Sequence, residues 1–245
     1  MSGDEPNPAY RRILIKLSGE ALAGDEKFGI TGNVLETIAK EVSNVVNTGV
    51  QVGIVIGGGN FFRGMSAAAS NMDRVTADYI GMLATVMNAL ALHQALESQG
   101  TPARIQSALD ITSIVEPYVR ARTFKHMKNA RVVIFAGGTG NPLFTTDTAA
   151  SLRAIEMNAE LMIKGTKVDG VFDDDPQTNP EAKRYEMLTY EQVLRDNLRV
   201  MDATAITLCR DHNMPIQVLN MNNPGSLLRA VQGQPEGTLV KKELT

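Results

Sequence analysis

The sequence predicts an α/β protein in which helices cover both faces of a mostly parallel central sheet. Three observations support this fold class. Short apolar runs alternate with longer segments of helical period, the apolar runs are bounded by Gly, Asn or Pro, and no internal repeat or linker divides the chain. Such alternation is typical of parallel strands joined by crossover helices. At 245 residues, the chain is long enough for one such domain with a sizeable core.

The expected strands are short runs of mostly β-branched and aliphatic residues, which suit a sheet that is buried on both faces. Five segments meet this description, namely Ile13–Leu17, Val52–Ile56, Val132–Phe135, Leu161–Ile163 and Ile216–Leu219. The part of the chain from Leu161 onward is compatible with a second lobe of the same sheet.

Helical patterns fill the intervals between these strands. The segment Val34–Val46 places its apolar residues on one face, as an amphipathic helix does. The segment Asp73–Leu96 is too apolar for a solvent-facing helix, so we expect burial in the core or, alternatively, at a subunit interface. A third helix is expected to open at Asp147 and to continue through Ile155, and Asp202 is expected to cap a fourth.

Composition argues against several classes of protein. A formal net charge of -3 argues against a general nucleic-acid binder, and the single cysteine, Cys209, permits no intramolecular disulfide. The segment Met1–Ala9 lacks the basic and apolar regions of a signal peptide, so we expect a disordered tail before one domain of residues 10–245. The most apolar segment, Ile80–Leu92, is too short to span a bilayer. We therefore expect a cytoplasmic protein with no nucleic-acid or membrane partner.

The most informative segment follows the third expected strand. Residues 137–140 read Gly-Gly-Thr-Gly, and two threonines and Asp147 then open a helix. A glycine turn before a helix start exposes backbone N–H groups and suits phosphate. Asp147 is unusual at such a site. It is either an N-cap, worth about 1 kcal/mol, or a group that orients a cation, a lysine or magnesium, between two phosphate groups.

Cationic residues stand near the ends of three other strands. Lys16 lies near the carboxyl end of the first strand, where ligands of open α/β sheets gather, although an edge-strand lysine that reaches solvent is the alternative. The turn Gly57–Gly59 allows close approach to a ligand, and Arg63 beside it can bind phosphate in bidentate fashion; a flexible turn is the simpler alternative. Lys164 and Lys167 follow the fourth strand.

Phosphate chemistry at such a site requires these cations. Two like unit charges 4 Å apart repel by about 4 kcal/mol at an effective dielectric near 20, whereas a helix end returns about 0.3–1 kcal/mol per charge. The sequence contains no P-loop, no Rossmann glycine spacing and no G-x-S-x-G elbow. Its three histidines are scattered and it has one cysteine, so we expect no metal site built from protein ligands.

Four segments together carry a family resemblance. They are Lys-Leu-Ser-Gly-Glu-Ala at 16–21, Ile-Gly-Gly-Gly-Asn at 56–60 with Arg63, Gly-Thr-Gly-Asn-Pro at 138–142 with Thr-Thr-Asp at 145–147, and Lys-Val-Asp-Gly-Val at 167–171. They resemble the amino-acid kinase superfamily and, within it, the bacterial uridylate kinases, over nearly all of residues 10–240. The resemblance implies a three-layer α/β/α sandwich, with an acceptor-binding part at about residues 10–160 and an ATP-binding part at about residues 161–245.

The resemblance also implies that the γ-phosphoryl group of ATP, bound with Mg²⁺, passes to UMP to give UDP and ADP in pyrimidine biosynthesis. Because a phosphate acceptor is already anionic, this transfer needs no general base. The residues implied in catalysis are Lys16, Arg63, Asp147, Lys164 and Lys167. Those implied in ATP binding are Lys16, Leu17, Ser18, Gly19, Gly59, Arg63, Thr166, Phe172 and Asp175. Those implied in UMP binding are Gly58, Asp78, Thr139, Gly140, Asn141, Pro142, Leu143, Phe144, Thr145 and Thr146.

Members of the family form homohexamers that are commonly activated by GTP and inhibited by UTP, and the same is implied for this chain. The loop linked to GTP matches Gly24, Asp25, Glu26, Lys27, Phe28 and Gly29. Arg104 and Arg131 are candidates for contact with an effector phosphate, while Glu97 departs from the basic or imidazole group expected nearby. Two alternatives are another family member that acts on a carboxylate or carbamate, and a nucleotide-binding regulator without catalysis.

Overall fold

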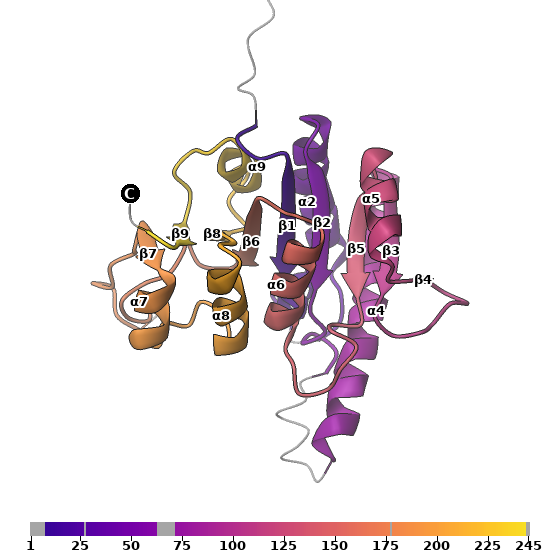
Figure 1. Cartoon of the computed structure of the whole chain (residues 1–245), viewed down its shortest axis with the longest axis horizontal. Coiled ribbons are helices and arrows are strands. Elements are labelled where there is room, and N and C mark those ends of the chain that lie inside the picture. The colour runs from indigo at the N-terminus through magenta and orange to yellow at the C-terminus, as the bar shows by residue number, and fades with distance from the viewer. Residues whose placement is uncertain (1–7, 27, 63–71, 177, 244–245) are drawn as a thin grey trace, which may run out of the picture.

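A computed structural model of the chain describes residues 8–26, 28–62, 72–176 and 178–243. Within these residues, nine strands form one sheet in the order β4-β3-β5-β2-β1-β6-β8-β9-β7 (Figure 1). The strands are β1 (Arg12–Leu17), β2 (Gln51–Ile56), β3 (Ala103–Ser107), β4 (Glu116–Pro117), β5 (Val132–Ala136), β6 (Leu161–Thr166), β7 (Met187–Thr189), β8 (Ile216–Asn220) and β9 (Thr238–Lys241). All neighbouring strands are parallel except β8 and β9, which are antiparallel.

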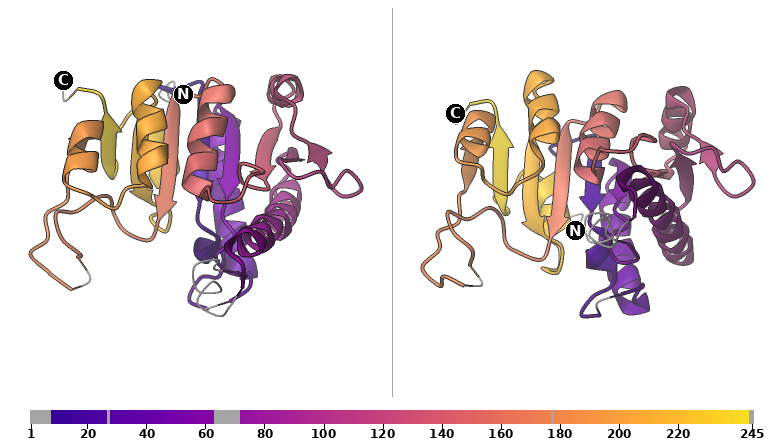
Figure 2. Two further views of the ribbon diagram at one scale, coloured as in Figure 1. Left: turned by 60° about the horizontal axis from the view of Figure 1, so that its bottom comes forward. Right: turned by 90° about the horizontal axis from the view of Figure 1, so that it is seen from below.

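Helices lie on both faces of this sheet, as Figure 2 shows. They are α1 (Gly19–Leu22), α2 (Gly32–Asn47), α4 (Arg74–Ser98), α5 (Arg120–Lys128), α6 (Thr146–Glu156), α7 (Tyr190–Arg195), α8 (Ala203–Asp211) and α9 (Ser226–Val231). One apolar core contains residues of α2, α4 and α9, and the other contains residues of α5 to α8. The predicted class, a mostly parallel sheet between two helical layers, is therefore confirmed.

Strand β1 shows how the two cores are divided. Ile13, Ile15 and Leu17 belong to the core under α2 and α4, whereas Leu14 belongs to the core under α6. Because side chains alternate along a strand, Lys16 lies on the same face as Leu14. The period of the strand thus directs Lys16 toward the helical layer that contains α6.

The expected elements appear with small shifts of their ends. The five predicted strands are β1, β2, β5, β6 and β8, and the strand predicted at Leu161–Ile163 continues to Thr166. The expected tail at residues 1–9 falls mostly outside the described residues. Its predicted end is wrong, because the backbone N–H of Ala9 donates to Val231 O at 2.9 Å and attaches this residue to α9.

Helix α4 has two different sides. One side is packed in the core, as expected, while the other exposes Val75, Tyr79, Leu83, Met87 and Leu90 at helical spacing. Among the described residues, this one helix is long and apolar enough to cross a membrane, and 44% of its most apolar window is buried inside the protein. Core packing on one side therefore explains part of its composition, and the exposed apolar side needs another explanation.

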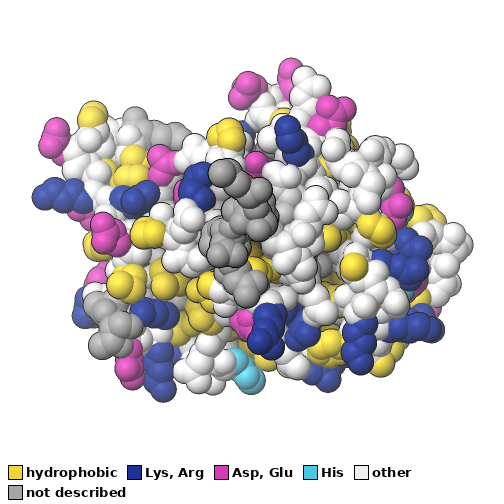
Figure 3. Space-filling view, turned by 90° about the horizontal axis from the view of Figure 1, so that it is seen from above, with side chains coloured by type: hydrophobic (Ala, Val, Ile, Leu, Met, Phe, Trp, Pro, Cys, Tyr) yellow, Lys and Arg dark blue, Asp and Glu magenta, His cyan; other side chains and the backbone are white. Residues whose placement is uncertain are grey.

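The amino-terminal edge of the sheet is seen from above in Figure 3. Lysine and arginine side chains are most numerous along the lower border of this view, where a few acidic side chains stand among them. The carboxyl ends of β1 and β5 point to the opposite edge, at the bottom of Figure 1. That edge carries the residues of the candidate site.

Candidate active site

The candidate site begins with two lysines on neighbouring strands. Parallel pairing of β1 with β6 places Lys16 directly opposite Lys164. Residues opposite each other in a parallel pair point to the same face of the sheet. The fold therefore holds two ammonium groups side by side near the carboxyl ends of the strands, where like charges repel unless an anion intervenes.

Asp147 provides that anion from the first turn of α6. The helix is capped by Thr145, whose side-chain oxygen accepts hydrogen bonds from the backbone N–H groups of Asp147 at 3.1 Å and Thr148 at 3.3 Å. The interpretation of Asp147 as the N-cap is therefore wrong. Because Thr145 performs the capping, the carboxylate of Asp147 is free to contact other groups.

The three charged side chains form a compact cluster. Lys16 Nζ lies 2.6 Å from Asp147 Oδ1, and Lys164 Nζ lies 3.4 Å from Asp147 Oδ2. Lys164 also donates a hydrogen bond to the backbone oxygen of Val200. The side chains of Lys16, Asp147 and Lys164 are 9%, 15% and 18% exposed, so the cluster is largely screened from water yet reachable from the surface.

Burial and charge shift the pKa values of this cluster. Burial alone would raise the pKa of Asp147, but Lys16 and Lys164 outweigh it and hold the pKa below its ordinary value. Burial lowers the pKa of Lys164, Asp147 raises it in part, and the positive charge of Lys16 lowers it further. The aspartate is thus ionised at neutral pH, and the cluster carries a cationic surplus toward any phosphate.

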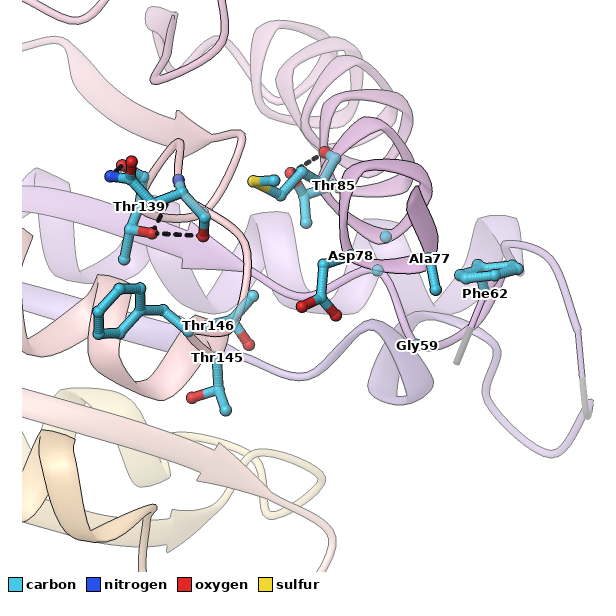
Figure 4. A pocket seen from close by; sticks show the side chains of 14 residues that line it. Gly59, Phe62, Ala77, Asp78, Thr85, Thr139, Thr145 and Thr146 are labelled. Atoms are coloured by element: carbon cyan, nitrogen blue, oxygen red, sulfur yellow. Dashed lines mark hydrogen bonds between the residues drawn. The ribbon is translucent and has the colours of Figure 1, made fainter. Parts of the chain in front are cut away.

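A pocket opens beside the start of α6 (Figure 4). Asp78 and Thr85 face it from α4, Thr139 and Thr145 face it from the loop after β5, and Thr146 faces it from the first position of α6. Of the residues expected to bind UMP, those that line it are Gly58, Asp78, Thr139, Asn141, Phe144, Thr145 and Thr146. Lining residues that sequence reasoning missed are Phe62, Ala77, Gly81, Met82, Thr85 and Gly138.

Three of the residues expected to bind UMP do not line this pocket, namely Gly140, Pro142 and Leu143. Gly140 N donates to Gly137 O at 2.9 Å, so it shapes the turn. Leu143 N donates to Asp78 Oδ2 at 2.8 Å, and Arg74 Nε donates to Asp78 Oδ1 at 2.9 Å. Asp78 therefore joins α4 to the loop after β5, and each of its oxygens keeps a second acceptor position for a ligand hydroxyl.

Backbone packing fixes the glycine turn at residues 57–59. A Cβ atom on Gly58 would lie 2.5 Å from Gly81 O and 2.9 Å from the Cβ of Ala84, so the turn rests directly on α4. A Cβ atom on Gly19 would lie 2.6 Å from Gly59 N and 2.8 Å from Gly57 O. Only glycine permits these approaches, which bring the ends of β1 and β2 together.

We predict that Gly58→Ala separates this turn from α4. The clash requires a backbone shift that lowers stability by about 1–3 kcal/mol and raises the KM for nucleotide substrates. Urea unfolding and steady-state kinetics measure both effects. Gly32→Ala is the matched control, because a Cβ atom there would meet nothing within 4 Å. Wild-type KM values in Gly58→Ala would contradict the prediction.

A second pocket lies on the other side of the cluster. Lys164, Thr166, Phe172 and Asp175 line it, which brings together three of the residues expected to bind ATP and one lysine. Sequence reasoning missed other lining residues, among them Asp196, Asn197, Leu198 and Arg199. They follow α7 and are remote in sequence from β6, so no local pattern marks them.

Other predicted residues take different places. Leu17 is fully buried, and the side chain of Ser18 caps α1 by accepting from Ala21 N at 3.2 Å. Gly59 lines the pocket beside α4 rather than the second one. Lys167 Nζ donates to Gly24 O at 2.6 Å. Among the described residues, Lys164 forms an ion pair with Asp147 and Lys167 does not. Arg63 lies outside the described residues.

The loop expected to respond to GTP lies close to the glycine turn. Gly29 N donates to Asn60 O at 3.1 Å, and the exposed Phe28 ring packs edge-on against Phe61 at 5.5 Å. Lys27 lies outside the described residues. The other effector candidates lie elsewhere: Arg104 pairs with Glu97 at 3.5 Å, and Arg131 contacts His126 at 3.4 Å.

Comparisons with known proteins agree with this arrangement. Residues 11–220 match the amino acid kinase family. A uridylate kinase from Ectopseudomonas mendocina (strain ymp) is 57% identical over 236 residues, which cover 96% of each chain. The structure of a UMP kinase from Bacillus anthracis superposes with a TM-score of 0.92 at 43% identity, covering 96% of this chain and 97% of that one. That of a UMP kinase from Ureaplasma parvum gives 0.89 at 36% identity, covering 95% and 99%. Because the family match and these relatives span most of its length, the chain belongs to the amino acid kinase family.

Proposed function

We propose that this protein is a UMP kinase, which transfers the γ-phosphoryl group of ATP to UMP and releases UDP and ADP. One observation carries the proposal: a cationic cluster lies between two pockets on one edge of the sheet. Thr145 and Thr146, which line the first pocket, directly precede Asp147, and Lys164 lines the second. We assign UMP to the first pocket and ATP to the second, so that the acceptor and the γ-phosphoryl group meet at the cluster.

Phosphoryl transfer to UMP depends mainly on neutralising charge and on positioning the two reacting groups. UMP already carries an anionic phosphate, so no side chain has to remove a proton from it. The obstacle is the repulsion between two phosphate groups, about 4 kcal/mol per pair of unit charges 4 Å apart at an effective dielectric near 20. Lys16 and Lys164 can offset it, and we assign transfer to these two rather than to Lys167. Asp147 keeps the two ammonium groups together when no phosphate is bound.

Mg²⁺ would enter with ATP and neutralise its phosphate oxygens. Among the described residues, no group of three or more His, Cys, Asp or Glu side chains is placed to hold a metal ion. Both oxygens of Asp147 contact lysines. A site that offers the single carboxylate of Asp147 fits an ion that takes most of its ligands from phosphate and water, as Mg²⁺ usually does. Asp147 therefore acts on the lysines in this proposal.

A coupled assay of ADP formation over a panel of acceptors tests the function. UMP, dUMP, CMP, glutamate and carbamate are offered with ATP and Mg²⁺, with and without GTP. We expect turnover on UMP and none on glutamate or carbamate. Turnover on a carboxylate or carbamate but not on UMP would replace the proposal with another amino-acid-kinase activity. Tight nucleotide binding with no turnover would indicate a regulator.

We further propose that GTP activates and UTP inhibits this enzyme. The support is the place of Phe28 and Gly29, which contact Phe61 and Asn60 just after the glycine turn. A ligand that shifts this loop would therefore also shift the turn. The family relatives and the absence of a basic surplus in the composition support a cytoplasmic enzyme without a nucleic-acid or membrane partner.

A homo-oligomer, and a hexamer in particular, is part of the same proposal. The exposed residues Val75, Tyr79, Leu83, Met87 and Leu90 form an apolar stripe on α4, and contiguous exposed apolar surface is typical of an interface. We predict that Leu83→Glu lowers the mass in solution, because it places an unpaired charge in that stripe. Sedimentation velocity measures the mass. Ile114→Glu, on an exposed hydrophobic residue between β3 and β4, serves as control. An unchanged mass in Leu83→Glu would exclude the stripe as the interface.

A further inference from the structure

Two asparagines are buried together beneath the glycine turn. Asn60 directly follows the turn and is 2% exposed, and Asn88 lies in the middle of α4 and is fully buried. Polar side chains in such surroundings lower stability unless every hydrogen-bonding group has a partner. The hydrogen-bond partners of this pair therefore show which backbone segments the fold holds in place.

The two amides satisfy each other and two backbone oxygens. Asn60 Nδ2 donates to Asn88 Oδ1 at 3.0 Å, and Asn88 Nδ2 donates to Asn60 Oδ1 at 2.7 Å. The second hydrogen of Asn88 Nδ2 goes to Gly57 O at 2.7 Å, and that of Asn60 Nδ2 goes to Gly29 O at 2.8 Å. An amide nitrogen has two hydrogens, so both groups use their full donor capacity. The backbone oxygens fix the orientation of both amides, because they can only accept.

The hydrogen bonds of this pair join three parts of the candidate site. Gly57 opens the turn, Gly29 closes the loop at residues 24–29, and Asn88 belongs to the helix on which the turn rests. Gly29 N also donates to Asn60 O, so Asn60 holds both the N–H and the carbonyl of Gly29. A Cβ atom on Gly19 would lie 2.6 Å from Asn60 Oδ1, which shows that the amide also reaches the end of β1.

We propose that Asn60 and Asn88 are positioning residues that hold the Gly57–Gly59 turn in the conformation in which it receives phosphate groups. This inference rests on the proposed function, because it deepens the account of the same site. Without the pair, Gly57 O would lose its partner inside the protein, and the turn would have to rotate that group toward water. Such a rotation would also move the backbone N–H groups of Gly58 and Gly59, and small displacements at a reacting centre have large effects on rate.

Asn88→Asp and Asn88→Ser test the proposal. Aspartate has nearly the same shape but no hydrogens to donate, and serine retains a polar group without a new charge. We expect both to lower kcat/KM for ATP and UMP by about tenfold or more, since an unsatisfied buried group has an effect of that size. Measurements are made well below the unfolding temperature of each variant, which circular dichroism determines.

A double-mutant cycle separates positioning from mere stability. Asn60→Ser and Asn88→Ser should each reduce kcat/KM, and the double variant should lose less than the product of the two, because both act through one network. Ser43→Ala is the matched control: Ser43 and Thr101 form another buried hydrogen-bonded pair, remote from the turn. We expect it to lower the unfolding temperature and to leave kcat/KM unchanged.

These experiments distinguish failure of this inference from failure of the proposed function. If folded Asn88 variants keep kcat/KM within twofold of wild type, the pair is only structural and the inference is wrong. If wild-type protein fails to phosphorylate UMP, the proposed function is wrong, and calorimetry of nucleotide binding, with a panel of mono- and triphosphates, then decides the inference. Weaker binding by the Asn88 variants of a nucleotide that wild type binds would support it, and equal binding of every such nucleotide would overturn it.

Discussion

Replacing Lys16 by methionine is expected to lower kcat for phosphoryl transfer by about 10²–10³-fold while the protein remains folded, as removal of one preorganised donor at a developing charge does. Lys16 Nζ lies 2.6 Å from Asp147 and faces the place where we locate the two phosphate groups. Methionine keeps the length and apolar stem of the side chain, so the packing around β1 is retained. The remaining Asp147–Lys164 pair is neutral, and it no longer offers the positive surplus that the phosphate groups require.

Stopped-time assays of ADP and UDP formation, together with urea unfolding, measure the two parts of this prediction. Lys40→Met is the control, because Lys40 is exposed on α2 and remote from the cluster. We expect the control to match wild type in rate and in stability. Lys16→Met should remain folded and lose less stability than Asp147→Asn, because Asp147 keeps Lys164 as a partner. A kcat within threefold of wild type would show that Lys16 does not act in transfer.

The sequence pointed to the cluster one residue at a time but not to its geometry. Lys16, Asp147 and Lys164 could each be selected because strands that end in turns collect ligands at their carboxyl ends. The register that places Lys16 opposite Lys164 depends on pairing between segments far apart in the chain. Lys164 and Lys167 could not be separated, because the choice depends on where β6 ends and on which way each side chain then points.

The strands that were not predicted from the sequence lack the local signals of a buried strand. Strand β3 contains Arg104, Gln106 and Ser107, so it lacks the apolar run that marks a central strand, and Gln106 is nevertheless buried. Strands β4, β7 and β9 are only two, three and four residues long. Tertiary pairing rather than local propensity decides such segments. The buried pair of Asn60 and Asn88 was equally hidden, since in the sequence Asn88 only interrupts an apolar helix.

Replacing Asp147 by asparagine is expected to reduce activity, and to reduce stability more than the change at Lys16 does. The substitution leaves Lys16 and Lys164 in register on neighbouring strands with no anion between them. Breaking a buried ion pair by removing one partner lowers stability by about 3–5 kcal/mol. The pKa of Lys164, which burial already lowers, should fall further when Asp147 no longer raises it. Urea unfolding at pH 7 measures the loss, with Asp211→Asn, at an exposed position of α8, as the control.

The pH dependence of this loss gives the sharper test. The pKa of Asp147 is lowered in the folded protein, so its contribution to stability is fully present above the unfolded value of about 3.9 and disappears as the pH falls through the folded value. The difference in unfolding free energy between wild type and Asp147→Asn should therefore be constant near neutral pH and shrink below about pH 4. A difference that stays the same from pH 7 down to pH 3 would mean that the charge of Asp147 does not stabilise the cluster. In that case the asparagine variant would lose activity through altered hydrogen bonding alone, and the two lysines would have to be held apart by the backbone contact of Lys164 with Val200.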